Sequence, residues 1–277
     1  MKEVQLANVG QVSKEINLSK QMRVITFNAV YLILGILVSK GTIFGVYSPF
    51  GAAFLAAVPY ESMVSSLVGV VIGYILPSEI NIGMRYISTV IAIAAIRWTL
   101  IDLKRVTNRK FYEPSLVFIT TIATGVAANI SSFSYTNQIS MYITEAMLAA
   151  ITSYFFKETI KALLLNKPNI TISQSEFTYI AITVFIIMLS LSEFTIGYIS
   201  VGKVIAVAAI LFSAKYLGIT GGSIAGIAAG IVFGLASRNP SYIAGAYSFG
   251  GLISSVAGTF GKFFCALSFL VSDILIS

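Results

Sequence analysis

The stretch GITGGSIAGIAAGIVFGLA, residues 218–236, contains no charged side chain and repeats glycine at every fourth position. This spacing places Gly222, Gly226, Gly230 and Gly234 on one face of a helix. In water, each glycine costs a helix about 1 kcal/mol relative to alanine. In a bilayer, a face without side chains lets a neighbouring helix approach closely, and packing then holds the pair together. The stretch therefore predicts a membrane-spanning helix that packs through its glycine face.

The rest of the chain has the composition of a multi-pass membrane protein. Of its 277 residues, 57% are hydrophobic and only 10% are charged, and the mean hydropathy is +0.89. No ordinary soluble core needs that much apolar surface. We expect an all-α, polytopic helical bundle of about 10–11 transmembrane or re-entrant helices over residues 23–277, preceded by a cytoplasmic tail over residues 1–22. The apolar runs cover residues 23–38, 43–58, 63–76, 85–101, 115–130, 140–156, 177–192, 197–213, 218–236, 242–257 and 262–276.

Several of these runs are shorter than the ~20 residues of a full crossing. In one interpretation every run crosses, which leaves Ser277 outside and suggests a chain that stops before a further span. In the other, residues 43–76 form a re-entrant hairpin broken at Pro49, Gly51 and Pro59. Both interpretations give the same sidedness.

The basic residues predict that sidedness. With a cytoplasmic amino terminus, 13 of the 18 Lys and Arg residues fall on the inner side, and only Lys40, Arg85 and Arg238 fall outside. This is a strong positive-inside bias. The inner loop that carries Lys104, Arg105, Arg109 and Lys110 is expected to anchor the topology and to attract anionic lipid headgroups, at about 1 kcal/mol per basic residue. Because the basic residues are spread among the connections, no nucleic-acid surface is expected.

The second long inner connection, residues 157–176, carries signals for the end of one helix and the start of the next. Asn166, Lys167, Pro168 and Asn169 form a helix-stop sequence. Ser173 stands three residues before Glu176, which is the spacing of a capping box. The next helix is therefore predicted to begin directly after Ser173.

The residue types exclude most catalytic chemistry. The chain has no histidine, and its single cysteine, Cys265, lies in an apolar run. A Ser-His-Asp triad, a His-ligated metal and a CxxC site are therefore impossible. Only two aspartates occur, Asp102 and Asp273, too few for the carboxylates of a divalent metal pair. No catalytic residue, cofactor site or metal site is expected in these residues.

Two charged residues inside apolar runs, Glu145 and Lys203, suggest an ion pair within the membrane. Glu145 and Lys203 each lie about five or six residues from the outer end of their predicted helices, so their depths match. A charge near the middle of a bilayer costs at least ~2.5 kcal/mol. An ion pair between the two would reduce that cost. The alternative is that each side chain reaches the outer interface alone.

The carboxy-terminal half resembles a known membrane region. Its motifs are GGSIAG at 221–226 with Gly230 and Gly234, AYSFGGL at 246–252, and Gly261-Lys262. The tract SPFGAAF at 48–54 and Glu145 fit an earlier part of the same region. Together these motifs resemble the multi-span region of the stage II sporulation protein E family. Gly250 and Gly251, in the second motif, join the glycines that we expect to pack helices.

The resemblance implies a function that the residues alone do not. The family joins about ten spans to a cytoplasmic segment that self-associates and contacts the tubulin-like division-ring protein. A metal-dependent serine phosphatase domain, which uses Mn or Mg, follows and dephosphorylates an anti-anti-sigma factor, releasing the forespore sigma factor at the polar septum. The resemblance thus implies the plasma membrane of an endospore-forming bacterium. We expect the chain to stop before the regulatory and phosphatase domains, so the metal and both protein partners belong to those domains.

Two classes of function remain open. The first is a membrane anchoring, localisation and assembly domain, whose partners are the lipid bilayer and further copies of the chain. The second is a small carrier that uses Glu145 and Lys203 in a midplane site. A carrier requires a polar cavity at half depth that contains both residues, whereas an anchor requires a closed bundle.

Overall fold

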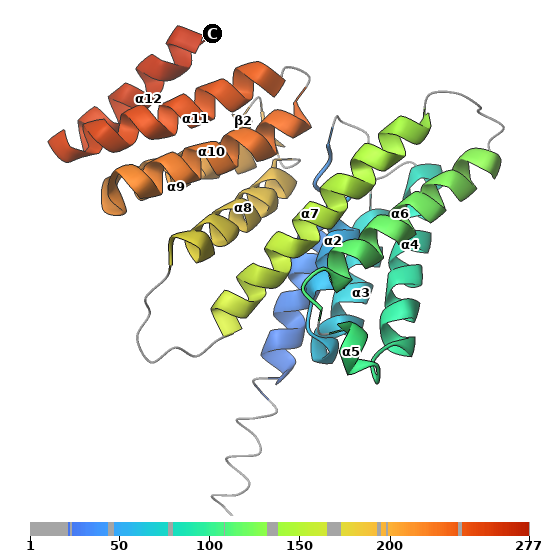
Figure 1. Cartoon of the computed structure of the whole chain (residues 1–277). Coiled ribbons are helices and arrows are strands. Elements are labelled where there is room, and N and C mark those ends of the chain that lie inside the picture. The colour runs from blue at the N-terminus through green and yellow to red at the C-terminus, as the bar shows by residue number, and fades with distance from the viewer. Residues whose placement is uncertain are drawn as a thin grey trace, which may run out of the picture.

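The structure is a computed structural model, and it describes residues 22, 24–43, 47–76, 80–107, 109–131, 138–164, 173–192, 195–197, 199–237 and 240–276. The predicted tail, residues 1–22, lies outside the described residues apart from Met22. The described chain is almost entirely helical, which confirms the predicted all-α class (Figure 1).

The first half contains a helix at Val24–Val38, α2 (Phe50–Ala57), the 3₁₀ turn η1 (Tyr60–Ser62), α3 (Met63–Ile75), α4 (Ile80–Thr99), α5 (Lys104–Thr107), α6 (Tyr112–Ser131) and α7 (Gln138–Leu164). The second half contains α8 (Gln174–Leu191), β1 (Thr195–Ile196), β2 (Ile199–Ser200), α9 (Val201–Tyr216), α10 (Gly218–Ala236), α11 (Pro240–Ala257), the 3₁₀ turn η2 (Gly258–Phe260) and α12 (Lys262–Ile276).

Five helices in the described part of the chain are long and apolar enough to cross a membrane. They cover Tyr112–Ile130, Ile139–Leu164, Gln174–Leu191, Gly218–Ala236 and Ser241–Phe260. The helices at Val24–Val38 and Tyr60–Ile75 are apolar but shorter. The chain is therefore a multi-pass membrane protein.

At one end of the bundle, the first helix and α3 finish beside the β1–β2 hairpin. We call this end the hairpin end. The Lys40 ammonium donates to the carbonyl of Leu76, so the ends of the first helix and of α3 lie together. The Ser190 hydroxyl, one turn before the β1–β2 hairpin, lies 3.4 Å from the carbonyl of Val38. The hairpin therefore lies at the end where the first helix and α3 finish.

The opposite end, which we call the basic end, holds the loop around α5. Lys157, near the end of α7, contacts Glu113 at the start of α6, and its ammonium is 3.4 Å from the carbonyl of Arg109. In the second half, the Lys215 ammonium at the end of α9 donates to the carbonyl of Gly258 at 2.8 Å, which joins the α9–α10 and α11–α12 connections. Successive helices therefore run in alternating directions, as the predicted topology requires.

Helix α2 is too short to cross a bilayer. Its 8 residues extend about 12 Å, against a hydrocarbon core of about 30 Å. Pro49 stands immediately before its first residue, and Pro59 follows its carboxy end by two residues. Seven of the eight residues are buried against neighbouring helices. The segment from Tyr47 to Pro59 nevertheless reaches from the hairpin end to the basic end, since Ser48 contacts Gly41 and the Val58 carbonyl accepts from Arg97 near the end of α4. This differs from the re-entrant interpretation of residues 43–76.

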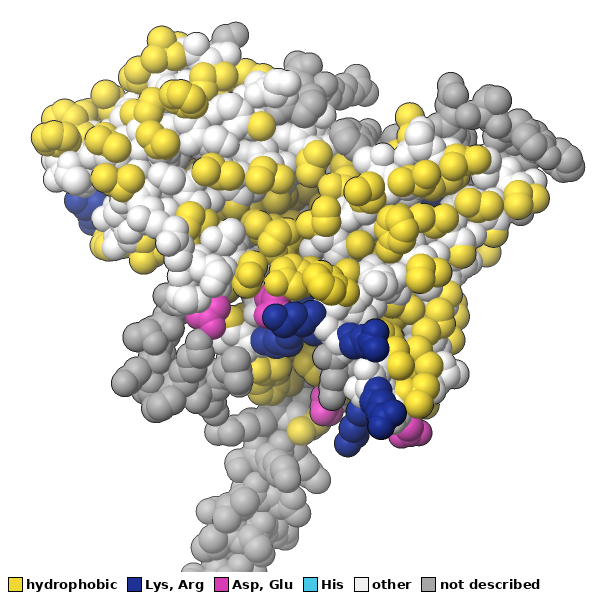
Figure 2. All heavy atoms as spheres, viewed as in Figure 1, with side chains coloured by type: hydrophobic (Ala, Val, Ile, Leu, Met, Phe, Trp, Pro, Cys, Tyr) yellow, Lys and Arg dark blue, Asp and Glu magenta, His cyan; other side chains and the backbone are white. Residues whose placement is uncertain are grey.

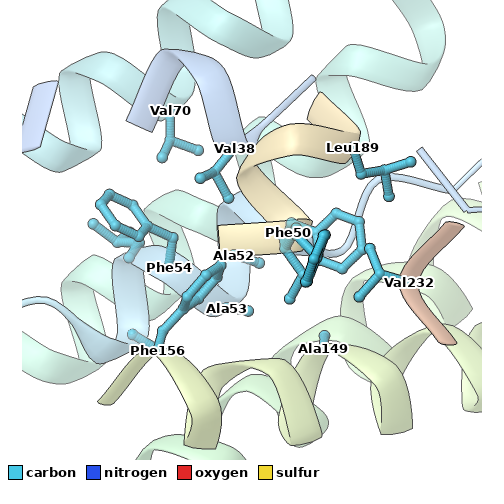
Figure 3. Packing of buried hydrophobic residues seen from close by; sticks show 14 of the residues in the cluster. Val38, Phe50, Ala52, Ala53, Phe54, Val70, Ala149, Phe156, Leu189 and Val232 are labelled. Carbon is cyan, nitrogen blue, oxygen red and sulfur yellow. The ribbon is translucent and has the colours of Figure 1, made fainter. Parts of the chain in front are cut away.

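One hydrophobic core joins the two halves. Phe50 of α2 lies among Leu189 of α8 and Val232 of α10 (Figure 3), and all three belong to a single buried cluster. One turn further along α2, Phe54 meets Phe156 of α7 edge to face, with ring centroids 5.6 Å apart. Helix α2 itself packs within the first group of helices, against α3, α4, α6 and α7, and Phe50 at its start faces the second group (Figures 1 and 3).

The start of α8 is the predicted one. The Ser173 hydroxyl accepts from the backbone N–H of Glu176, and the Glu176 carboxylate accepts from the backbone N–H of Ser173 at 2.9 Å. This capping box satisfies two backbone N–H groups that would otherwise lack partners at the start of the helix.

Candidate functional site

Glu145 forms an ion pair with Arg85, which corrects the predicted pairing with Lys203. Glu145 lies in α7 and is 2% exposed, and its Oε2 accepts from an Nη of Arg85 in α4. Lys203 lies in the first turn of α9, where it is exposed. The prediction failed because equal depth does not make two helices neighbours: α7 packs on α2, α6 and α8, whereas α9 packs on α8, α10, α11 and α12.

Three tyrosine rings surround the Arg85 guanidinium. Its central carbon lies 4.6 Å from the ring centroid of Tyr86, 4.8 Å from that of Tyr142 and 5.9 Å from that of Tyr47. A cation is attracted to the electron-rich face of an aromatic ring, and the attraction grows when water is excluded. The rings therefore stabilise the Arg85 charge in addition to the Glu145 carboxylate.

The same tyrosines fix the connection before α2. The Tyr86 hydroxyl accepts from the backbone N–H of Ser48 at 2.9 Å, and the Tyr74 hydroxyl donates to the Ser48 carbonyl at 2.8 Å. The Tyr74 and Tyr86 rings are stacked with centroids 5.1 Å apart. The ion pair, the rings and the entry to the inserted helix α2 therefore form one polar cluster near the hairpin end.

A cavity of about 330 Å³ lies beside this cluster. Its lining is mostly apolar, with Ile43, Pro49 and Leu148 among its residues, and Glu145 contributes to one side. The Glu145 Oε1 atom is buried and has no hydrogen-bond partner among the residues that the structure describes. The cavity can therefore offer one acceptor oxygen to a hydrogen-bond donor. Lys203 is not among its lining residues.

The described residues contain no group of three or more His, Cys, Asp or Glu side chains that could hold a metal ion. The only carboxylate in the polar cluster is that of Glu145, and it is already paired with Arg85. The cluster can bind, orient or hold a charge, but it offers no nucleophile beside a base.

The glycines of α10 face α11, whose residues come very close. A Cβ atom at Gly226 would lie 2.7 Å from the carbonyl oxygen of Tyr247 and 2.9 Å from Cα of Gly251. At Gly230 it would lie 2.7 Å from the carbonyl oxygen of Ala244. Real side chains essentially never come so near to backbone atoms, so the two helices meet backbone to backbone.

The other glycines of the predicted packing set serve different contacts. A Cβ atom at Gly222 would lie 2.6 Å from Cβ of Ser255 in α11 and 2.7 Å from Cα of Ala214 in α9, and one at Gly250 would lie 2.7 Å from the Phe269 ring in α12. Gly234 is buried in α10. The glycines therefore bring α9, α10, α11 and α12 together within one chain.

A second glycine-mediated crossing was missed by the sequence analysis. A Cβ atom at Gly69 or Gly73 of α3 would collide with the backbone carbonyl of Leu32 or Ile36 in the first helix. A Cβ atom at Gly35 of the first helix would lie 3.0 Å from the carbonyl oxygen of Ser66 in α3. The four-residue spacing of Gly69 and Gly73 was the available signal.

The four basic residues of the α5 loop are exposed. Lys104 and Arg105 lie in α5, and Arg109 and Lys110 follow it. Figure 2 shows Lys and Arg side chains gathered at the end of the molecule where α5 lies, below a surface rich in hydrophobic side chains. Free, clustered cations at the end of an apolar bundle are suited to contact anionic headgroups.

Comparison with known proteins gives one match. The family model described as SpoIIE, N-terminal domain, matches residues 1–277, which is the whole chain. No curated protein and no solved structure matches the chain.

Proposed function

Because the chain belongs to the SpoIIE N-terminal domain family, we propose that it is the anchoring, localisation and assembly domain of a sporulation-specific serine phosphatase. The family match over residues 1–277 is the observation that carries the proposal. The chain is a SpoIIE-like membrane region, and it would hold a cytoplasmic phosphatase domain at the polar septum of an endospore-forming bacterium. Catalysis, with its Mn or Mg, and contacts with the division-ring protein and the anti-anti-sigma factor would belong to the cytoplasmic domains of the family.

The packing of the bundle supports an anchor. A large buried core joins both halves, and close glycine contacts join the helices α9, α10, α11 and α12 to one another. Broad apolar faces, such as Leu270, Ile274 and Leu275 of α12, remain exposed to lipid or to further copies. Self-association of the chain within the membrane is part of the proposal.

A carrier is supported less well. Its predicted cavity should contain both Glu145 and Lys203, and the cavity beside Glu145 is lined mainly by apolar residues and does not include Lys203. Glu145 is paired with Arg85, whose guanidinium is enclosed by aromatic rings, and such a pair is suited to holding α4 and α7 together. The anchor is therefore the function that we propose.

The test is the localisation of residues 1–277 without any other domain. A fluorescent protein fused to the amino terminus should concentrate at the polar septum of sporulating cells. The same reporter on an unrelated polytopic membrane protein should label the whole membrane evenly and serves as the control. Even labelling by the 1–277 fusion, at equal expression, would contradict a localising role for this domain.

A further inference from the structure

A second pocket, at the basic end, is built from charged residues. It has a volume of about 450 Å³, and its lining includes Tyr60, Arg97, Glu113, Lys157 and Lys161. Three of these side chains are cations and one is a carboxylate. The pocket lies between the end of α4, the start of α6 and the end of α7, close to the exposed loop around α5. Its position is therefore that of the headgroups of one leaflet.

Arg97 holds the pocket wall in place. Its two Nη groups donate to the carbonyls of Leu55 and Val58, the latter at 2.7 Å, and thereby satisfy the carboxy end of α2. The side chain is 4% exposed, and no acidic side chain in the described residues forms an ion pair with it. Its direct partners are carbonyl dipoles and a ring, and the one carboxylate of the lining, Glu113, is paired with Lys157, so the three cations leave a positive potential in the pocket.

Two donors of the pocket are unused. The Nε–H of Arg97 and the hydroxyl of Tyr60 are buried and have no hydrogen-bond partner within the described part of the chain. The Tyr60 ring lies 4.5 Å from the Arg97 guanidinium, so both donors belong to one place. An oxyanion that entered the pocket beside these two residues would offset the buried charge of Arg97.

The remaining cations are only partly neutralised. Lys157 is paired with Glu113, and Lys161 is 2.8 Å from Glu158 but keeps about half of its side chain exposed. An ammonium has three N–H groups, so each lysine can contact a further anion without losing its present partner. Phosphate oxygens, with their charge and several acceptor positions, match this set of donors better than a carboxylate does.

An apolar groove continues from the pocket. It has a volume of about 310 Å³ and is lined by residues such as Val24, Phe27 and Tyr31 of the first helix. The groove and the pocket share Pro59 and Leu164 in their linings, so they adjoin, and Glu61 lies on the groove side. A ligand with a phosphate group and an acyl chain would fit both, and basic pockets between transmembrane helices are sites of this kind.

We propose that the pocket of Arg97, Tyr60, Lys157 and Lys161 binds the phosphate group of an anionic phospholipid, whose acyl chain lies in the adjoining groove. The proposal rests on the proposed function in one respect, since the basic end then faces the cytoplasmic leaflet. The bound lipid would tie the inserted helix α2 to α4 and α7.

The test measures binding of three matched probes to the purified full chain in mild detergent, as the shift of the thermal unfolding midpoint with concentration. Dioctanoyl phosphatidylglycerol has the phosphate and the chains, dioctanoylglycerol has only the chains, and inorganic phosphate has only the anion. We expect saturable stabilisation by the phospholipid and none by dioctanoylglycerol. Equal stabilisation by inorganic phosphate would retain the phosphate site and assign it to a soluble source. Equal effects of dioctanoylglycerol and the phospholipid would overturn the proposal.

Variants identify the site. Glu113→Gln, Lys157→Gln and Lys161→Gln together remove the lysines without leaving Glu113 as an unpaired charge, and should weaken phospholipid binding at least tenfold. The matched control, Lys203→Gln, removes an exposed cation in the first turn of α9, outside the pocket, and should change binding less than about twofold. Tyr60→Phe keeps the ring over Arg97, removes only the hydroxyl, and should weaken binding several-fold.

Unchanged phospholipid binding in both the triple variant and Tyr60→Phe would overturn the assignment. This outcome is separable from a failure of the proposed function. A chain that reaches the septum but binds no phospholipid is an anchor without this site, whereas a chain that binds phospholipid but labels the membrane evenly has the site without the localising role.

Discussion

Glu145 is the residue whose charge depends most on a single partner. Its side chain is 1% exposed, and that of Arg85 is 12% exposed. A buried pair of this kind contributes little net stability relative to apolar residues of the same size, because both charges lose their hydration. Removing one partner is different, since the remaining charge is then buried without compensation.

We therefore predict that Glu145→Gln and Arg85→Gln each lower the free energy of unfolding by about 3–5 kcal/mol. The double variant should be clearly more stable than the sum of the two losses implies, because it leaves no unpaired charge. Unfolding in mild detergent is the measurement. Lys161→Gln, which breaks the exposed pair with Glu158, is the control and should cost less than about 1 kcal/mol. Additive losses in the double variant would show that Glu145 and Arg85 do not act as a pair.

For a single residue such as Glu145, the sequence predicts that burying its charge costs free energy, but it does not predict which residue pairs with it. A carboxylate about five residues into an apolar run must be compensated, and this much follows from the position of Glu145 alone. Its partner depends on which faces of which helices meet. Arg85 was assigned to an outer connection, and nothing in its neighbourhood along the chain shows that Tyr47 and Tyr142 enclose it in space.

Among the described elements, α10 and α11 share the most extensive contact. Gly226 and Gly251 oppose each other, so the backbones are separated by no side chain at that point. Many weak dispersion contacts and the absence of side-chain entropy loss favour such a crossing in lipid. Gly218, with φ of +69°, makes the turn from α9 into α10 in a conformation that other residues rarely adopt.

Gly226→Ala should destabilise the bundle, although alanine favours a helix more than glycine does. The added methyl group would lie 2.7 Å from the Tyr247 carbonyl oxygen, and forcing the helices apart should cost about 1–3 kcal/mol. Gly245→Ala, in α11, is the matched control, because its Cβ would meet only Ile276 Cγ2 at 3.5 Å, an ordinary contact. It should be neutral or stabilising by up to about 1 kcal/mol. Equal melting temperatures of the two variants in mild detergent would contradict the packing role of Gly226.

The sequence predicts elements better than their contacts. The glycine spacing of residues 218–236 was enough to expect a packed helix, and Ser173 with Glu176 was enough to place the start of α8. Pro49 and Pro59 marked the limits of the short α2. The same glycine spacing at Gly69 and Gly73 drew no prediction, because a spacing shows that a face is flat and leaves open which helix covers it.

For the whole molecule, the alternating helices sort charge between two ends. Lys40 and the β1–β2 hairpin lie at one end, and Lys104, Arg105 and Lys157 lie at the other. The positive-inside rule then predicts that the basic end faces the cytoplasm. The structure defines the two ends, whereas the assignment of each end to a side of the membrane comes from charge alone.

Single cysteines can test this orientation. In a Cys265→Ser background, Ile196→Cys places a thiol in the hairpin at a position that is 77% exposed, and Arg105→Cys places one in the exposed basic loop. A membrane-impermeant maleimide added to intact cells should label the Ile196→Cys variant and leave the Arg105→Cys variant unlabelled, and permeabilised cells should show labelling of both. The unsubstituted chain is the control, because Cys265 is 2% exposed and should stay unlabelled in both preparations. Labelling of only the Arg105→Cys variant in intact cells would reverse the orientation, and would place the phosphate pocket in the outer leaflet, because the pocket and the basic loop share one end of the bundle.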